Sequence, residues 1–169
     1  MARHYYLLMA FSEHDAAMAA ERSFAQLQLT LVDLGLLACI TNTWQTNEGI
    51  WLFSVHPTGV SLGVANDPPR LTSTDQLDEV ARQLYQQLRQ VEGYICAVAG
   101  WEVAELFMIE AHSSYQDLHF GPEVFAKTGW DGLVMQETMW TRMDTPAEFE
   151  PFAPGYVWRP HQAPGIFGW

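Results

Sequence analysis

The longest apolar run of the chain, residues 94–110 (YICAVAGWEVAELFMIE), places the tightest constraint on its fold. Before Gly100 the run is continuously apolar, which is typical of a strand that is covered on both faces. After Gly100 it alternates loosely between apolar and polar residues, which is typical of a strand with one solvated face. The run therefore predicts two strand segments that are separated by a bend or tight turn at Gly100.

A first helix is expected over residues 12–35. Ser12 is a candidate N-cap, because acidic residues follow it in the first turn, where a helix favours negative charge. Apolar residues then recur at steps of three and four up to a stop near Gly35. Leucines also alternate from Leu27 to Leu31, so the far end of this segment could instead be extended.

A second helix is expected over residues 73–93, with Ser73 or Thr74 as its N-cap and Gly93 as its stop. Its apolar residues form one stripe, and its charged residues and glutamines form an ordinary solvated face. Apolar or alternating runs predict strands at residues 4–11, 50–55, 60–65, 133–140 and 156–158, and residues 36–40 are a further short apolar run. A turn at residues 56–59 would join two of these strands in a hairpin, while residues 41–49 and 144–155 are expected to be connections.

Up to residue 110 the order is strand, helix, strand, strand, helix, strand, which is the order of ferredoxin-like proteins. We therefore expect an α+β fold with a mostly antiparallel sheet and two main helices. Extra C-terminal strands would follow, and then an irregular arm over residues 155–169. Since neither a repeat nor a domain boundary is evident, residues 1–169 are expected to form a single domain.

The charge of the chain narrows the class of its partners. Its 169 residues include 8 basic and 20 acidic ones, which gives a net charge of −12. This balance argues against nucleic acid and against an anionic membrane surface, because both require clustered Lys and Arg. Long-range attraction would favour a basic partner, and the alternative is that the acidity serves only solubility.

The cysteines and the apolar runs indicate a cytoplasmic protein. Cys39 and Cys96 lie in apolar contexts without a CxxC motif, as buried thiols do in a reducing compartment. The alternative is a single disulfide between them. The N-terminal apolar run is too short for a signal peptide. No run approaches the roughly 20 apolar residues of a membrane helix.

The sequence contains no motif for covalent or phosphate chemistry. The GxSxG turn of serine hydrolases is absent, and the glycines lack the flanking pattern of a phosphate-binding loop. Neither cysteine has the positive neighbour that would activate a thiol. We therefore expect no catalytic residue, no cofactor and no enzymatic activity.

The best candidate metal ligands are Glu110, His112, Asp117 and His119. In extended chain, each of the pairs EAH and DLH would place a carboxylate and an imidazole on one face, and both groups suit a divalent metal. Their spacing fits no defined type of site, and scattered polar residues in a loop explain it equally well, so we expect no metal. The other histidines are isolated in the sequence and are expected at the surface or in turns: His4, His14, His56 and His161.

Seven tryptophans are many for this length, and several lie beside acidic residues. Aromatic anchors next to carboxylates suit the binding of a basic protein, whereas the alternative is that the rings fill the core. Glu105 falls on the apolar face of its predicted strand, so it would be a perturbed carboxylate unless a bulge after Gly100 turns it outward. The expected partner-binding residues are Trp101, Glu102, Glu105, Trp130, Asp131, Glu137 and Trp140.

A small, acidic, tryptophan-rich α+β domain without a catalytic constellation resembles the bacterial immunity proteins of polymorphic toxin and type VI secretion systems. The resemblance extends over the whole chain, includes Gly129-Trp130 and the other dispersed tryptophans, and rests on no diagnostic motif. It implies a cytoplasmic protein that binds a cognate toxic effector, many of which are basic nucleases. Such a protein would occlude the active site of the effector or lock its conformation, with acidic groups aiding capture.

Two other functions stay open. The chain could be a small enzyme or ligand-binding protein of ferredoxin-like type, with a pocket lined by His and Glu between the sheet and residues 112–119. It could also be a structural subunit of a homo-oligomer, whose aromatic residues would be buried by its own copies.

Overall fold

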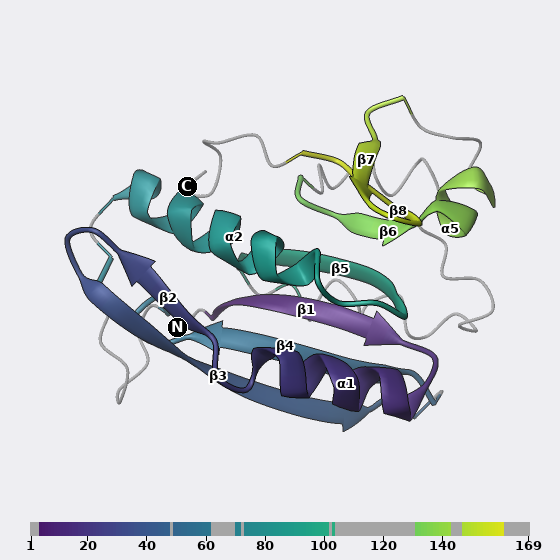
Figure 1. Cartoon of the computed structure of the whole chain (residues 1–169), viewed down its shortest axis with the longest axis horizontal. Coiled ribbons are helices and arrows are strands. Elements are labelled where there is room, and N and C mark those ends of the chain that lie inside the picture. The colour runs from purple at the N-terminus through teal and green to yellow at the C-terminus, as the bar shows by residue number, and fades with distance from the viewer. Residues whose placement is uncertain are drawn as a thin grey trace.

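The computed structural model describes residues 4–47, 49–61, 70–71, 73–101, 103, 131–142 and 147–160. Within them, eight strands form one antiparallel sheet in the order β2-β3-β4-β1-β5-β6-β8-β7 (Figure 1). The strands are β1 (Tyr5–Phe11), β2 (Gln28–Leu31), β3 (Gly35–Gln45), β4 (Trp51–Pro57), β5 (Tyr94–Trp101), β6 (Val134–Gln136), β7 (Glu150–Ala153) and β8 (Tyr156–Trp158). The described helices are α1 (His14–Phe24), α2 (Thr74–Leu88) and α5 (Glu137–Arg142). The expected α+β fold, with a mostly antiparallel sheet and two main helices, is confirmed.

The central strands of the sheet are buried on both faces. Alternate residues of β1 belong to two clusters: Tyr5, Leu7, Met9 and Phe11 pack with α1 and α2, on what we call the helix face. Tyr6, Leu8 and Ala10 belong to the second cluster, on what we call the outer face. β5 likewise contributes to both clusters, as its continuous apolar sequence predicts.

Helix α2 follows its sequence pattern closely. The Ser73 side chain accepts a hydrogen bond from the backbone N–H of Gln76 at 3.3 Å, so the predicted N-cap is confirmed. The predicted apolar stripe is buried throughout: Leu77, Val80, Ala81, Leu84, Leu88 and Val91. All of them belong to the cluster on the helix face, where they pack with residues of β1 and β5.

Helix α1 is shorter than the sequence suggests. Its N-cap is Glu13 rather than Ser12, and no side chain bonds the cap. The helix ends at Phe24, and residues 28–31 form β2, so the extended alternative for the leucine-rich end is the right one. Leu29 of β2 pairs with Leu37 of β3, and both are fully buried, because strand geometry places them on the helix face.

The strand β3 extends through most of the segment predicted as a polar connection. Residues 41–45 pair with β4, from Thr41 opposite Val55 to Gln45 opposite Trp51. Thr and Trp fit well on a half-buried sheet surface, so their polarity did not mark a loop. The predicted pairing of residues 50–55 with 60–65 is wrong, because β4 already has β3 at one edge and β1 at the other. His56 and Pro57 continue β4 and do not form the predicted turn.

The first segment of the long apolar run is confirmed as β5, which continues to Trp101. Val103 is helical, so a second strand does not begin there, and residues 104–110 lie outside the described residues. A Cβ atom at Gly100 would lie 2.8 Å from Cγ1 of Val103. The missing side chain at Gly100 thus lets the chain fold back onto the end of β5.

The C-terminal strands agree with the predictions only in part. β8 is confirmed, but the strand expected over residues 133–140 is β6 followed by helix α5. Residues 150–153, within a predicted connection, form β7, which pairs with β8 across a turn at Gly155, where φ is 77°. Since glycine adopts this backbone conformation without strain, Gly155 permits a tight hairpin that joins two short strands.

A side chain of α2 and that of its C-cap residue, Arg89, bond to the two outer edges of the sheet. At the β2 edge, the Gln83 side-chain amide accepts from Thr30 N at 2.9 Å and donates to Thr30 O at 2.7 Å. At the β7 edge, Arg89 Nη1 donates to Phe152 O, and the neighbouring Pro151 has no N–H to offer. An open edge is a template for pairing with another chain. Here the side chains of Gln83 and Arg89 form hydrogen bonds with backbone groups of the two edge strands.

We expect Gln83→Ala to lower the free energy of unfolding by about 0.5–1.5 kcal/mol, because two hydrogen bonds to Thr30 are lost at a solvated site. Gln83→Glu should cost at least as much, since a carboxylate cannot donate to the Thr30 carbonyl. Urea unfolding measures both variants. The matched control is Gln86→Ala, whose side chain makes one longer contact at 3.3 Å with Arg82. Equal midpoints for Gln83→Ala and Gln86→Ala would contradict the edge contact.

Candidate functional site

The predicted partner-binding residues do not form one patch. Trp101 ends β5 on the helix face, half-buried, with its ring 5.4 Å from Tyr5 in an edge-on contact. Trp140 lies in α5, also half-buried, and packs against the outer-face cluster. The sheet therefore separates these two tryptophans. Three further predicted residues lie outside the described part of the chain: Glu102, Glu105 and Trp130.

The two remaining predicted carboxylates differ in their surroundings. Asp131 Oδ1 lies 3.1 Å from Arg159 Nε, and both side chains are about one-third exposed or less. The two atoms are not aligned for a hydrogen bond, so charge attraction holds the pair. Glu137 is exposed at the first position of α5. Of this pair, only Glu137 presents an unpaired charge to solvent.

The candidate metal ligands at residues 110–119 also lie outside the described residues. Within the described ranges, no three His, Cys, Asp or Glu residues lie close enough to hold a metal ion. Both cysteines are free thiols, Cys39 beside the helix-face cluster and Cys96 within the outer-face cluster. Burial raises the pKa of Cys39 to about 11 and that of Cys96 further, so neither is a thiolate at neutral pH.

His56 is not the turn histidine that its sequence position suggested. It lies in β4, half-buried, with Nε2 2.9 Å from Oγ of Ser54, and its ring stacks on Tyr6 at 4.6 Å. Ser54 is only 1% exposed, so its hydroxyl is closed to a substrate, and the contact satisfies a buried polar group. The S-x-H spacing would have located this pair, because residues two apart share one face of a strand.

The β2–β3 hairpin exposes large apolar side chains, which we call the hairpin patch: Val32 (99% exposed), Leu36 (56%) and Ile40 (61%). Leu36 and Ile40 lie on the outer face of β3, opposite the buried Leu37. The turn that carries Val32 projects at one end of the molecule, on the left in Figure 1. Grouped apolar exposure of this kind is typical of a binding surface.

Four of the six described arginines make hydrogen bonds or ion pairs within the chain. Arg70 donates to the carbonyls of Leu34 and Leu36, Arg89 to that of Phe152, while Arg82 and Arg159 pair with carboxylates. The other two, Arg22 and Arg142, lie in the last turns of α1 and α5, where a helix favours a cation.

Most described carboxylates, in contrast, have no cationic partner. Twelve described residues are acidic, against the six arginines. Among them only Glu79 and Asp131 form an ion pair with an arginine. The hydrogen bond from Arg82 lowers the pKa of Glu79, as expected for a paired carboxylate. The negative charge therefore belongs to the folded surface.

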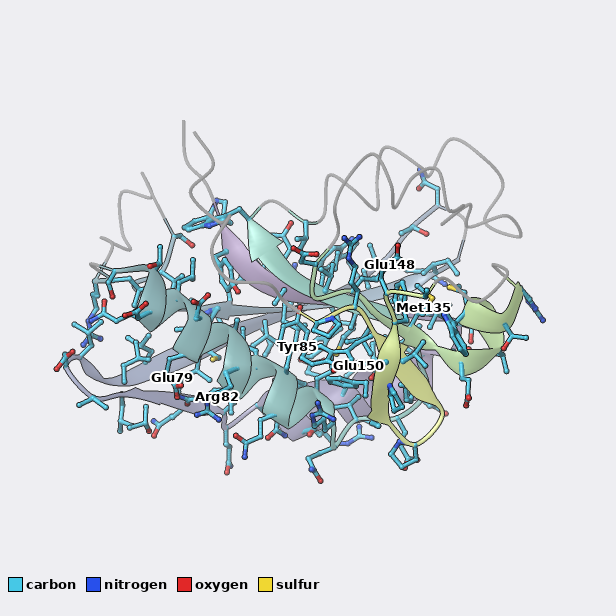
Figure 2. All side chains as sticks on the ribbon, turned by 90° about the horizontal axis from the view of Figure 1, so that it is seen from above. Glu79, Arg82, Tyr85, Met135, Glu148 and Glu150 are labelled. Carbon is cyan, nitrogen blue, oxygen red and sulfur yellow. The ribbon has the colours of Figure 1, made fainter. Side chains whose placement is uncertain are left out.

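A groove runs beside α2, on the flank that faces β8. Its volume is about 580 Å³, and it is lined by Asp78, Ala81, Arg82, Tyr85, Gln86, Arg89 and Trp158. We call it the α2 groove. Figure 2 shows Tyr85 between the helix and the β7–β8 hairpin. No sequence signal predicts it, because Trp158 lies some seventy residues beyond the helix that forms the other wall.

Comparison of the chain with protein-family models, with curated proteins and with solved structures finds no match. The described helices include none that is both long and apolar enough to cross a membrane. Three features of the described residues suit binding: the acidic surface, the hairpin patch and the α2 groove.

Substitutions in β3 should separate its two faces. We expect Leu37→Ala to lower the free energy of unfolding by about 2–5 kcal/mol, because it leaves a cavity under the helices. Ile40→Ala should change it by less than about 0.5 kcal/mol, because that side chain is already in solvent. Thermal or urea unfolding measures both. A cost at Ile40 as large as that at Leu37 would show that the hairpin patch is not exposed.

The buried tyrosines should make the fold sensitive to alkali. Burial raises the pKa of Tyr5, Tyr85, Tyr94 and Tyr156 above the ordinary value of 10.0. Below pH 10 both the folded and the unfolded chain keep these phenols neutral. Above it the unfolded chain loses protons first, so stability should fall as pH rises. Absorbance titration should show these tyrosines ionising together with unfolding, whereas a gradual ionisation near pH 10 in folded protein would contradict the burial.

Proposed function

We propose that this chain is a cytoplasmic binding protein of the immunity type, which captures a basic toxic effector protein and neutralises it. The observation that carries the proposal is the imbalance of the described surface, where twelve carboxylates face six arginines, four of the arginines bond within the chain, and most carboxylates face solvent without a basic partner. A field of one sign speeds the encounter with a partner of the opposite sign and disfavours partners of like sign. Neutralisation would follow from covering the active site of the effector or from locking its conformation.

The hairpin patch would supply the apolar part of the contact. Protein interfaces combine a desolvated apolar centre with a polar rim, and the centre carries most of the affinity. Val32 is followed directly by Asp33 in the turn, so an apolar and an acidic side chain are offered together. Leu36 and Ile40 extend the apolar surface along β3.

We also propose that β3, β4, β1 and β5, with α1 and α2, form a ferredoxin-like unit. In support, β1 lies between β4 and β5, β4 lies between β3 and β1, and all these pairs are antiparallel. The second function that suits such a unit is a small enzyme or ligand-binding protein with a pocket lined by His and Glu. The residues predicted for that pocket, 112–119, lie outside the described part of the chain.

The proposal predicts a basic partner whose association depends on the acidic surface. Tagged protein recovered from its own cells should carry a basic protein in stoichiometric amount, and co-expression should relieve the toxicity of that protein. With the purified partner at low salt, Asp33→Lys combined with Glu137→Lys should slow association by about tenfold. High salt should remove the difference, because it screens exposed charges.

The matched control adds charge of the opposite sign on the same helix. Arg142→Glu in α5 should leave the association rate equal or raise it, since the surface becomes more acidic. An acidic partner would overturn the proposal. So would an association rate that the double variant leaves unchanged at low salt.

A further inference from the structure

The α2 groove has the size of a small-molecule site. Its volume of about 580 Å³ falls within the roughly 300–1,000 Å³ that ligand pockets occupy. One wall is the flank of α2, and the other includes Trp158 at the end of β8. It shares no residue with the hairpin patch, so the two surfaces can be tested separately by mutation.

The apolar wall of the groove is held rigidly. The Tyr85 hydroxyl donates to Gly132 O at 2.7 Å and accepts from Ala99 N at 2.9 Å, so both sides of this buried group are satisfied. Its ring meets Trp158 edge-on, with the centroids 5.6 Å apart. A wall that is fixed before binding loses little conformational entropy on binding, which favours a compact apolar ligand.

The charge of the groove comes mainly from Arg89. Its guanidinium lies 4.1 Å above the Phe152 ring and 5.6 Å from that of Trp158, and Nη1 donates to Phe152 O. Among the described residues no carboxylate pairs with Arg89, whereas Arg82 is held by Glu79 through two short hydrogen bonds of 2.6 and 2.7 Å. Arg89 therefore has N–H donors left for an anion.

The acidic groups near the groove limit which anion can bind. Asp78 lies eleven residues before Arg89, about 16 Å along the helix, and Glu150 accepts from Trp158 Nε1 at 3.2 Å. With a net charge of −12, the protein repels ligands of high negative charge such as polyphosphates. A monoanion with a large apolar body meets less repulsion and gains from the rings.

We propose that the α2 groove binds a hydrophobic monoanion, a carboxylate or sulfonate with an aromatic or aliphatic body. The body packs between Ala81, Tyr85 and Trp158, and the anionic head bonds to Arg89. Binding is non-covalent and draws on two terms, the burial of apolar surface and a charge-assisted hydrogen bond.

The test uses 8-anilinonaphthalene-1-sulfonate, an aromatic monoanion whose fluorescence rises on binding, with the full-length protein. We expect saturable binding at one site. Octanoate should displace the probe, and octylamine, which has the same chain length and the opposite charge, should not. Arg89→Gln should weaken probe binding by at least about tenfold, because a charge-assisted hydrogen bond is lost. Arg142→Gln, the same change of charge on α5, should leave it unchanged.

Two further variants keep the test decisive. Gln86→Trp, at an exposed position of the groove lining, should abolish binding by filling the groove without entering the core. Leu36→Ser combined with Ile40→Ser removes the hairpin patch and should leave binding unchanged. Loss of binding in this last variant would overturn the proposal, since the probe would then be adsorbed on the hairpin patch. Equal competition by octylamine, or no probe binding at all, would overturn it as well.

Discussion

Helix α2 and its C-cap residue, Arg89, bond to both edges of an open sheet. Eight strands leave two edges, β2 and β7, each with backbone groups that another chain could pair with. The Gln83 side chain forms hydrogen bonds with the backbone N–H and C=O of Thr30 on β2, and Arg89 donates to the Phe152 carbonyl on β7. For a single helix to reach both edges, the sheet must curve toward it, as the natural twist of a sheet allows (Figure 1).

The acidic surface follows from the small number of basic residues and from the contacts that they make within the chain. Arg89 closes an edge, Arg70 holds the hairpin through the carbonyls of Leu34 and Leu36, and Arg159 holds the chain after β8 to Asp131. Each of these arginines bonds within the chain, although Arg70 and Arg89 stay exposed to solvent. With so few basic residues in the chain, the carboxylates outside stay uncompensated. A cationic partner would relieve the mutual repulsion of these carboxylates. The excess of acidic over basic residues therefore favours a basic partner.

The sequence predicts those elements whose pattern is local. The helix α2 and the strands β1, β5 and β8 could be located because capping, helical spacing and continuous apolar runs are each visible within one segment. The errors concern pairing. Thr41 to Gln45 look like a loop until β4 is placed beside them, and residues 60–65 look like a hairpin partner until both edges of β4 are occupied.

The candidate site was harder to predict for the same reason. Trp101 precedes Glu102 and Trp140 lies three residues after Glu137, but the sheet places the two tryptophans on opposite faces. Only Ser54 and His56 have a local signal, because their spacing of two residues fixes a shared face. Arg89 and Phe152 lie 63 residues apart, and nothing local joins them.

The walls of the α2 groove are a consequence of closing the sheet. Tyr85 is fixed by hydrogen bonds to Ala99 of β5 and to Gly132 just before β6, and Arg89 by the edge strand β7. These hydrogen bonds therefore also hold in place two side chains that line the groove, Tyr85 and Arg89. These hydrogen bonds do not determine which ligand charge the groove prefers. That preference comes from Arg89 bonding to a neutral carbonyl and two aromatic faces instead of a carboxylate, so the cation stays uncompensated within an acidic surface.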